Sequence, residues 1–152
     1  MIKPVFTIGP SPDAQALRYE VFVQEQNVVH EFDDYDPGSW SLVLYLDGLP
    51  IGTGRLIRLS PVLGQIGRVA VKKEFRHRQV GTYILRFLER KAQEIGILRL
   101  EVHAQCDKIG FYQKCGYLLE EGDVFMDEGI PHRHMSKQLQ IRKRRRYGKA
   151  AY

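Results

Sequence analysis

The sequence predicts an α/β fold built around one central mixed β-sheet. β-rich runs occur at residues 3–8, 41–59 and 64–71. Residues 80–95 show helical periodicity, and another β-rich run follows at 98–104. A strand, a helix and a strand in that order form a right-handed crossover between parallel strands. Since the earlier run 41–59 also contains a hairpin, parallel and antiparallel pairs are expected in one sheet.

The N-terminal segment carries clear boundary signals. Residues 3–8 are expected to form an edge strand, because Pro4 near its start lacks a backbone donor. A helix is expected over residues 11–26, with Ser11 as its N-cap and Pro12 at its first position.

Residues 31–40, EFDDYDPGSW, form an acidic and turn-rich segment. Two interpretations stay open: an ordinary hydrophilic loop, or a loop that attracts a cationic amine. Residues 41–59 are expected to form a β-hairpin, because Asp47 and Gly48 are a typical turn pair between two β-rich runs.

The second half continues the sheet. The periodic helix at 80–95 is expected to stop at Gly96. Residues 107–116 predict a short helix capped by Asp107, and residues 132–139 predict a last strand of the sheet.

The composition is that of a soluble globular protein. Of its 152 residues, 43% are hydrophobic and 27% are charged. No apolar run approaches the roughly 20 residues that cross a bilayer, and the first residues lack the pattern of a secretion signal. We therefore expect a cytoplasmic protein without membrane contact, whose Cys106 and Cys115 are reduced.

The positive net charge is concentrated near the C-terminus. Six Lys and Arg residues lie between 142 and 149; removing them from 23 leaves 17 basic against 18 acidic residues, a net charge of −1. We expect a single domain at residues 1–140 and a flexible basic tail at 141–152. Such tails are usually solvated ends, although their charge also suits contact with nucleic acid.

The junction before the long helix carries unusual charge for a turn. The first N–H groups of that helix have no internal partner and bear the positive end of its dipole. Gly81 leaves room for close approach to the backbone. The junction is therefore either a solvated basic turn or a site for a phosphate or pyrophosphate. Its basic residues are Lys72, Lys73, Arg76, His77 and Arg78.

A family resemblance favours the anion site. The stretch RHRQVGTYIL resembles the pyrophosphate-binding pattern Arg/Gln-x-x-Gly-x-Gly/Ala of the GNAT N-acetyltransferase superfamily. Arg76 and Gly81 match it, whereas Gln79 replaces the first glycine. Three further stretches, LRYEVFVQEQNV, FYQKCGY and DEGIPHRHM, resemble the ElaA/YjcF-like branch in order and separation. The resemblance covers residues 15–137.

The resemblance implies the GNAT acyl-CoA N-acyltransferase fold, a mixed sheet with a splayed parallel strand pair flanked by helices. It implies acetyl-CoA as co-substrate and no metal. The acetyl group would pass directly to a primary amine of a small-molecule or peptide-like acceptor in a ternary complex. Backbone groups of Val69 and Val71 would pair with the pantetheine arm, and the basic loop would hold the pyrophosphate. The implied cofactor-binding residues are Val69, Val71, Arg76, His77, Arg78, Gln79, Val80, Gly81 and Thr82.

Two proton transfers need residues. By resemblance, Tyr112 in FYQKCGY is the acid for the departing thiolate, since a phenol is protonated at neutral pH. The alternative is that Tyr112 is aromatic core. Glu25 and His103, with His132 beside them, are candidate bases for the acceptor ammonium. If its strand turns His103 toward the core, it is a structural histidine instead.

Other interpretations stay open. Arg18 either lines the acceptor pocket or pairs with Glu20 or Glu25. The spacing of His and Cys matches no standard zinc pattern. The alternative function is a non-catalytic acyl-CoA-binding or interaction module whose basic tail contacts nucleic acid. The identity of the acceptor and the formation of a homodimer are left undecided.

Overall fold

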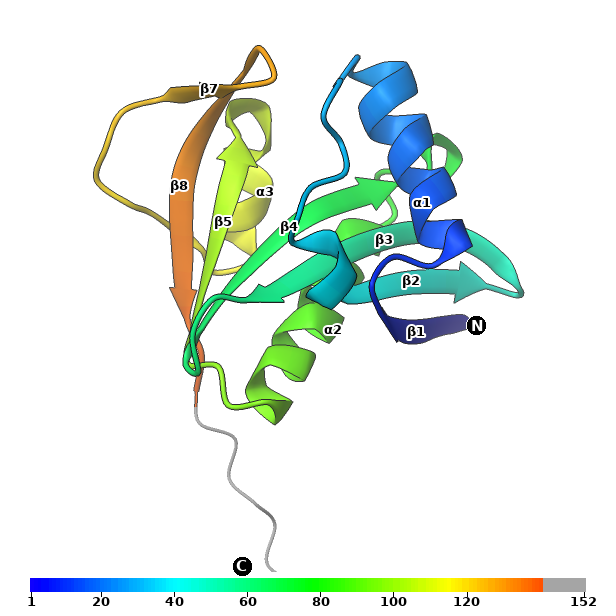
Figure 1. Ribbon diagram of the computed structural model, residues 1–152, viewed down its shortest axis with the longest axis horizontal. Helices are drawn as coiled ribbons and strands as arrows, with labels where there is room; N and C mark the ends of the chain where they lie inside the picture. Colours follow the sequence, from blue (N-terminus) through cyan, green and yellow to red (C-terminus); the bar gives the residue numbers. More distant parts are fainter. Residues whose placement is uncertain (141–152) are drawn as a thin grey trace, which may run out of the picture.

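The computed structural model describes residues 1–140, so the basic tail at 141–152 lies outside the described part of the chain. Within residues 1–140, eight strands form one sheet in the order β1-β2-β3-β4-β5-β8-β6, with β7 paired to β8 (Figure 1). Neighbouring strands are antiparallel except β4 and β5, which are parallel. The predicted mixed α/β sheet is confirmed. The strands are β1 Ile2–Ile8, β2 Trp40–Leu46, β3 Leu49–Arg58, β4 Leu63–Val71, β5 Arg99–Gln105, β6 Leu118–Leu119, β7 Phe125–Asp127 and β8 Ile130–Gln138.

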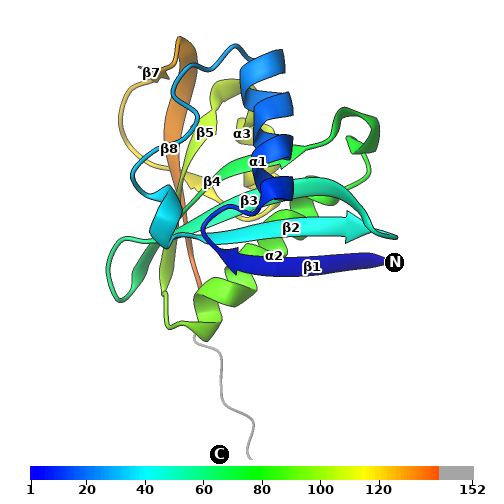
Figure 2. The ribbon, with the colours of Figure 1, turned by 45° about the vertical axis from the view of Figure 1, so that its right-hand side comes forward.

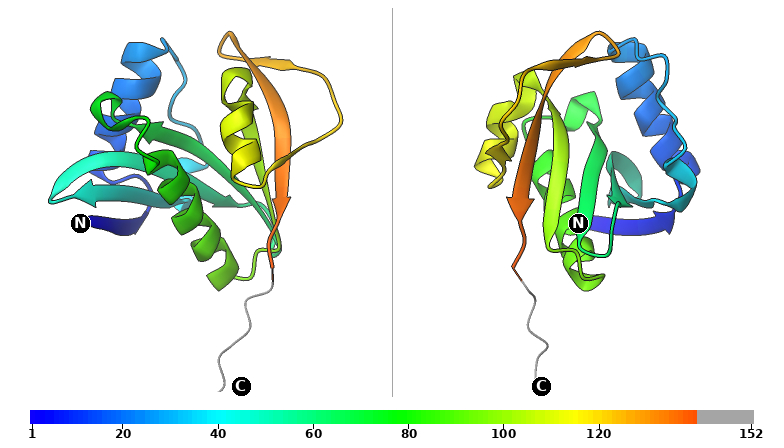
Figure 3. Two further views of the ribbon diagram at one scale, coloured as in Figure 1. Left: turned by 180° about the vertical axis from the view of Figure 1, so that it is seen from behind. Right: turned by 60° about the vertical axis from the view of Figure 1, so that its left-hand side comes forward.

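Three α-helices cover the two faces of the sheet. Helix α1 (Pro12–Arg18) lies against one face, whereas α2 (Val80–Glu94) and α3 (Ile109–Lys114) lie against the other (Figures 2 and 3). Helix α2 connects the parallel strands β4 and β5, as the crossover prediction requires. No helix within residues 1–140 is long and apolar enough to span a bilayer.

Helix α1 begins as predicted and then widens. The Ser11 hydroxyl accepts a hydrogen bond of 3.2 Å from the Ala14 N–H, which makes it the N-cap. The helix continues as a π-helical stretch, Tyr19–Glu25, where the Gln26 N–H reaches back to the Val21 carbonyl at 3.2 Å. The predicted helix is therefore confirmed, but its wide second half was not predicted. Such widened turns are frequent at functional sites.

The hairpin prediction is also confirmed. Strands β2 and β3 are joined through Asp47 and Gly48, both with positive φ, as in the turns that match the twist of a hairpin. Strand β1 pairs with β2 alone among the described strands, so it is the expected edge strand.

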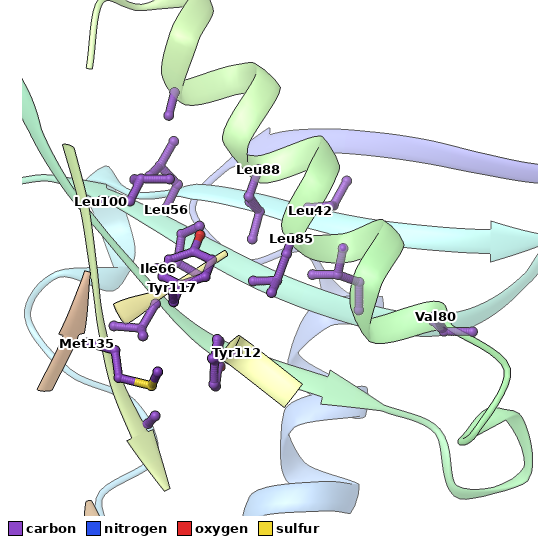
Figure 4. Packing of buried hydrophobic residues seen from close by; sticks show 14 of the residues in the cluster. Leu42, Leu56, Ile66, Val80, Leu85, Leu88, Leu100, Tyr112, Tyr117 and Met135 are labelled. Atoms are coloured by element: carbon purple, nitrogen blue, oxygen red, sulfur yellow. The ribbon is translucent and has the colours of Figure 1, made fainter. Parts of the chain in front are cut away.

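The sheet buries side chains on both faces, and the larger apolar cluster lies under α2. Leu85 and Leu88 of α2 point toward Leu42 and Leu56 of the sheet (Figure 4). The helix sits close to the backbone of β3: a Cβ atom on Gly54 would lie 2.7 Å from Ile84 Cγ2. On the other face, Val43 packs in a small cluster with Ala14 and Leu17 of α1.

The C-terminal third differs from its prediction in two details. Asp107 does not cap α3; it lies in a 3₁₀ turn, Cys106–Lys108, and the N-cap position is Lys108, which makes no side-chain cap. Strand β8 is longer than predicted and lies between β5 and β6. Two short strands that the sequence did not predict, β6 and β7, pair with it. Cys106 and Cys115 are free thiols.

Candidate active site

Strands β4 and β5 diverge along their length. They pair only from Leu63 opposite Arg99 to Ile66 opposite Val102, although β4 continues to Val71 and β5 to Gln105. Figure 1 shows the two strands running apart beyond this point. The splayed parallel pair expected from the family resemblance is thus confirmed.

A β-bulge in β4 lies where the divergence begins. In the pairing with β3, Arg55 lies opposite Gly67 and Thr53 opposite Ala70, so β4 has one extra residue there. Arg68 within this bulge has φ 52, in the left-handed region. Bulges bend a strand and increase its twist, which accounts for β4 leaving β5 at this level.

The divergence opens a cavity of about 670 Å³. It brings together residues from the wide half of the first helix, from β3, β4 and β5, from the loop before α2, and from α3 and the β7–β8 region. All predicted site residues but one line it. They are Glu25, Val69, Val71, Arg76, His77, Gln79, Val80, Gly81, Thr82, His103 and Tyr112. The exception is Arg78, whose guanidinium lies 5.7 Å from the centre of the Phe75 ring.

The loop before α2 presents a row of backbone donors. His77 and Gln79 both have φ 63, so the chain turns twice through the left-handed region. Within residues 1–140, the N–H groups of residues 77–82 donate no hydrogen bond. They lie at the positive end of the α2 dipole, and all of these residues except Arg78 line the cavity, which suits an anion. The conformation of Gln79 also explains why the family pattern has glycine at this place.

Gly81 has a second role that its motif did not predict. A Cβ atom there would lie 3.1 Å from Phe111 Cζ, so this glycine allows α3 to pack against the first turn of α2. This contact supports a packing role for Gly81, and its role in leaving room for a ligand stays a prediction.

Arg76 connects two sides of the cavity. Its Nε donates to the Val71 carbonyl at 3.0 Å, and its Nη2 donates to the Glu25 carboxylate at 3.0 Å. Glu25 is therefore an ion-paired residue in this structure.

Tyr112 lies on the opposite side of the gap from α1. Its ring is packed edge-on against Phe111 and Tyr117, with centroids 5.1 and 5.7 Å away. Figure 4 shows Tyr112 and Tyr117. Burial raises the pKa of the phenol, and the nearby Cys115 raises it further. No hydrogen bond within residues 1–140 holds the hydroxyl, and the residue lines the cavity. The Tyr112 ring is thus packed in the core, while its hydroxyl has no hydrogen-bond partner among residues 1–140.

His103 faces the cavity and not the core, so the alternative of a core histidine is wrong. It lies opposite His134, with ring centroids 4.7 Å apart, and 5.5 Å from the Phe125 ring. Desolvation within this aromatic group lowers the pKa of His103, and the charge of His134 lowers it further. His132 lines the same cavity, with its Nδ1 2.7 Å from the Ile130 carbonyl. Among residues 1–140, no group of His, Cys, Asp or Glu is arranged to hold a metal ion.

The sequence missed a cluster of arginines and carboxylates beneath α1. The acidic segment is not simply a hydrophilic loop, because three arginines bind its Glu31, Asp33 and Asp36. Arg18, only 2% exposed, does not line the cavity and pairs with an acid, as one of the two alternatives held, but its partners are Glu31 and Asp36 instead of Glu20 or Glu25. The other members of this cluster, called here the arginine cluster, are Arg55, Arg68 and Asp33.

Burial and pairing act in opposite directions on Asp36. Burial alone raises the pKa of Asp36, but the hydrogen bond from Arg18, with the Asp33 N–H and the charges of Arg18 and Arg55, lowers it to about 2. One residue of the sequence could have indicated this cluster. Arg55 lies in the middle of an apolar strand, and charged residues are rarely buried without a partner.

A mixed sheet with a splayed parallel pair, a helix N-terminus at one end of the gap and a tyrosine beside it defines an acyl-CoA N-acyltransferase fold. The chain belongs to the acetyltransferase (GNAT) family, whose sequence model matches residues 10–117. The general reaction of this family is acetyl transfer from acetyl-CoA to an amine.

Individual proteins agree with this assignment. The chain is 38% identical over 127 residues to YjcF of Bacillus subtilis, described as an uncharacterized N-acetyltransferase, covering 82% of this chain and 90% of YjcF. It resembles the crystal structure of a Lactobacillus plantarum protein assigned as an N-acetyltransferase, with 33% identity, a TM-score of 0.83, and coverage of 91% and 99%. The structure of Escherichia coli ElaA shares the fold, at 22% identity, a TM-score of 0.78, and coverage of 90% and 99%. These relatives support the ElaA/YjcF-like branch.

Proposed function

We propose that this protein transfers the acetyl group of acetyl-CoA to a primary amine of a small-molecule or peptide-like acceptor, with both substrates bound together. The observation that carries the proposal is the gap between β4 and β5. The N–H groups of residues 77–82 donate no hydrogen bond within residues 1–140, all of these residues except Arg78 line the cavity in this gap, and Tyr112 also lines it. These groups fit the anionic and thioester parts of acetyl-CoA.

Different residues of the gap would bind different parts of acetyl-CoA. The N–H groups of residues 77–82 would hold the pyrophosphate, and the basic side chains around them would add charge. Val69 and Val71 would offer backbone groups to the pantetheine amides. The Val71 carbonyl already accepts one hydrogen bond from Arg76 Nε, and its second lone pair would be left for a ligand amide.

The reaction forms an N–C bond to the acceptor and breaks the C–S bond of the thioester. His103 would take the proton that the acceptor ammonium loses, and Tyr112 would give a proton to the departing sulfur. His103 is favoured over Glu25 because Glu25 is bound to Arg76. The lowered pKa of His103 also keeps its imidazole neutral, and therefore basic, at neutral pH. Alignment of amine and thioester supplies the remaining catalysis.

The experiment is a thermal-shift titration followed by a thiol-release assay. A ligand that binds only the folded state adds about 2.7 kcal/mol at 100 times its Kd, which raises the Tm of a chain of this size by about 5–10 °C. Adenosine 3′,5′-bisphosphate, which lacks the pyrophosphate and the pantetheine arm, is the matched control and should raise the Tm much less. An unchanged Tm at millimolar acetyl-CoA would refute the cofactor assignment. Thiol release that depends on an added amine would then establish transfer.

The alternative of a non-catalytic module with a nucleic-acid-binding tail rests on residues 141–152, which lie outside the described residues. No observation on residues 1–140 favours it over transfer.

A further inference from the structure

The three guanidinium groups of the arginine cluster differ in how many of their nitrogens donate hydrogen bonds within residues 1–140. Arg18 donates through Nε, Nη1 and Nη2, to Glu31 and Asp36. Arg55 donates only through Nη1, to Asp33 and Asp36. Arg68 donates through Nε to the Glu31 carbonyl and through Nη2 to Asp33. Arg55 and Arg68 therefore have N–H groups left over.

The spare donors belong to the two arginines that line the cavity. Arg55 and Arg68 contribute to its wall, whereas Arg18 does not. The Arg55 side chain is 5% exposed, and its Nε is buried without a partner among residues 1–140. A buried donor without an acceptor is costly to a folded protein. Nε itself is closed off from a ligand, whereas Arg68, with its side chain 26% exposed, carries donors that a ligand in the cavity can reach.

The electrostatics around these two arginines also favour an anion. The oxygens of Asp33 and Asp36 are already engaged by arginines. Burial lowers the pKa of Arg68, and the positive charge of Arg55 lowers it further, whereas Asp33 and Glu31 raise it. Arg55 and Arg68 line the cavity, but their carboxylate partners do not. Within residues 1–140, the acids that line it are Asp127 and Glu25, and Glu25 is paired with Arg76.

The position of this wall relates it to the acceptor. Arg55 lies on the α1 face of the sheet, where it reaches Asp36, and His103 projects into the same cavity from β5. Tyr112 belongs to the apolar cluster on the α2 face. The two faces would therefore serve the two substrates, with the acceptor on the α1 side.

We propose that Arg68, backed by Arg55, binds an oxyanion group of the acceptor, so that the preferred acceptor is an amine that also carries a carboxylate or a phosphate. The proposal rests on the proposed acetyl transfer. Arg68 holds the anionic end, and His103 removes the proton from the amine at the other end. Guanidinium forks suit both anions through paired charge-assisted hydrogen bonds.

Kinetics with matched amines test the proposal. Amino acids, their carboxamides and aminoalkyl phosphates are compared as acceptors by their kcat/KM. Each is measured with the unmodified protein and with the variants Arg68→Gln and Arg68→Lys. The control variant is Arg58→Gln, because Arg58 is an arginine of β3 that donates to the Pro61 carbonyl. The anionic member of each pair should have a kcat/KM at least tenfold higher. Arg68→Gln should lower that value by about 10- to 100-fold and change the value for the neutral amine by less than threefold. Arg68→Lys should restore part of the preference, and Arg58→Gln should keep all of it.

Equal kcat/KM values for acid and carboxamide in the unmodified protein would overturn the proposal. So would a loss in Arg68→Gln that is the same for charged and neutral amines. The choice between carboxylate and phosphate follows from which anionic series is faster.

A binding measurement keeps this test separate from the proposed function. With the protein saturated by CoA, acetate and inorganic phosphate are titrated while the arginine Nε–H signals are followed by NMR. One of the two anions should shift the Arg55 and Arg68 signals, and Arg68→Gln should abolish the Arg55 shift. The absence of any shift would refute the oxyanion site even if acetyl transfer is found. A shift in a protein that transfers no acetyl group would refute the proposed function and leave the anion site in place.

Discussion

Helices α1 and α2 lie against opposite faces of one sheet and contact it by different means. Under α2, leucines and isoleucines pack directly on the strands, as close as the backbone of Gly54. Under α1, a small apolar cluster gives way to buried arginines and carboxylates. Apolar packing is stable over a wide range of pH and salt, whereas a buried ion pair depends on every partner. The difference separates a face that maintains the fold from a face whose polar groups border the cavity.

The largest effect, on turnover, is expected for the Tyr112 hydroxyl, a polar group on the apolar α2 face. Tyr112→Phe keeps the ring against Phe111 and Tyr117 and removes only the hydroxyl. Turnover should fall by about 10²- to 10⁴-fold, the usual contribution of a general acid, with the affinity for acetyl-CoA nearly unchanged. Steady-state kinetics beside a cofactor titration check this. A rate within threefold of the original would mean that Tyr112 serves only in packing.

Stability should respond most strongly on the ionic face. Arg18→Leu removes the nearer of the two arginines that pair with Glu31 and one of the two arginines that pair with Asp36. Removing one partner of a buried ion pair costs about 3–5 kcal/mol, or roughly 6–20 °C in Tm. Leu88→Ala, on the apolar face, should cost about 2–5 kcal/mol by opening a cavity. Calorimetry should show that only the Arg18→Leu loss varies with pH; equal pH profiles for both variants would contradict the comparison.

The pH dependence of turnover should come from His103. Because its pKa is lowered from the usual 6.5, the imidazole is neutral at pH 7 and becomes protonated only below pH 6.5. At saturating substrates, kcat should fall about tenfold per pH unit below that folded-state pKa. His103→Gln should lower kcat and remove this acidic limb. If the limb persists in His103→Gln, another group or water is the base.

Acid should destabilise the ionic face within a defined range. The pKa of Asp36 is lowered to about 2 from 3.8, so its contribution to stability is present above pH 4 and is lost as the pH falls toward 2. Urea unfolding between pH 5 and pH 2 measures the loss. The slope should be reduced in Asp36→Asn and retained in Gly54→Ala, whose added methyl group meets only the side chains of α2. An unchanged slope in Asp36→Asn would assign acid sensitivity to other carboxylates.

The smallest effect is expected at the left-handed turn of the cofactor loop. Gln79 has φ 63, a conformation that costs a residue other than glycine about 1–2 kcal/mol, partly offset by the greater flexibility of glycine in the unfolded chain. Gln79→Gly should therefore raise the Tm by about 2–4 °C and change the acetyl-CoA affinity by less than threefold. Thermal unfolding with and without the cofactor tests both statements. A lower Tm would show that the Gln79 side chain contributes contacts of its own.

The contrast between the apolar face under α2 and the ionic face under α1 also explains which features could be predicted from the sequence. Leu85 and Leu88 recur at helical spacing, and the turn at Asp47 and Gly48 is local, so both are visible in a single sequence. The pairing of Arg18 with Asp36 joins residues 18 positions apart through a folded loop, and no local pattern encodes it. The loop before α2, proposed to bind the cofactor, was predicted from its motif and from the first turn of a helix. The orientation of His103 could not be predicted, because it depends on which face of the assembled sheet its side chain lies on.

The bulge at Arg68 has a consequence for the alternation of side chains along β4. Before it, Ile66 lies opposite Leu56 and packs in the cluster under α2. Beyond it, Val71 lies opposite Gly52 and packs against that same cluster, while the small Ala70 lies opposite Thr53 on the α1 side. The extra residue therefore inverts the phase of the strand halfway along. Deleting that one residue would give β4 as many steps between Ile66 and Val71 as β3 has between Leu56 and Gly52, so Val71 would stay opposite Gly52 on the α2 side and the bulge that bends β4 away from β5 would be lost.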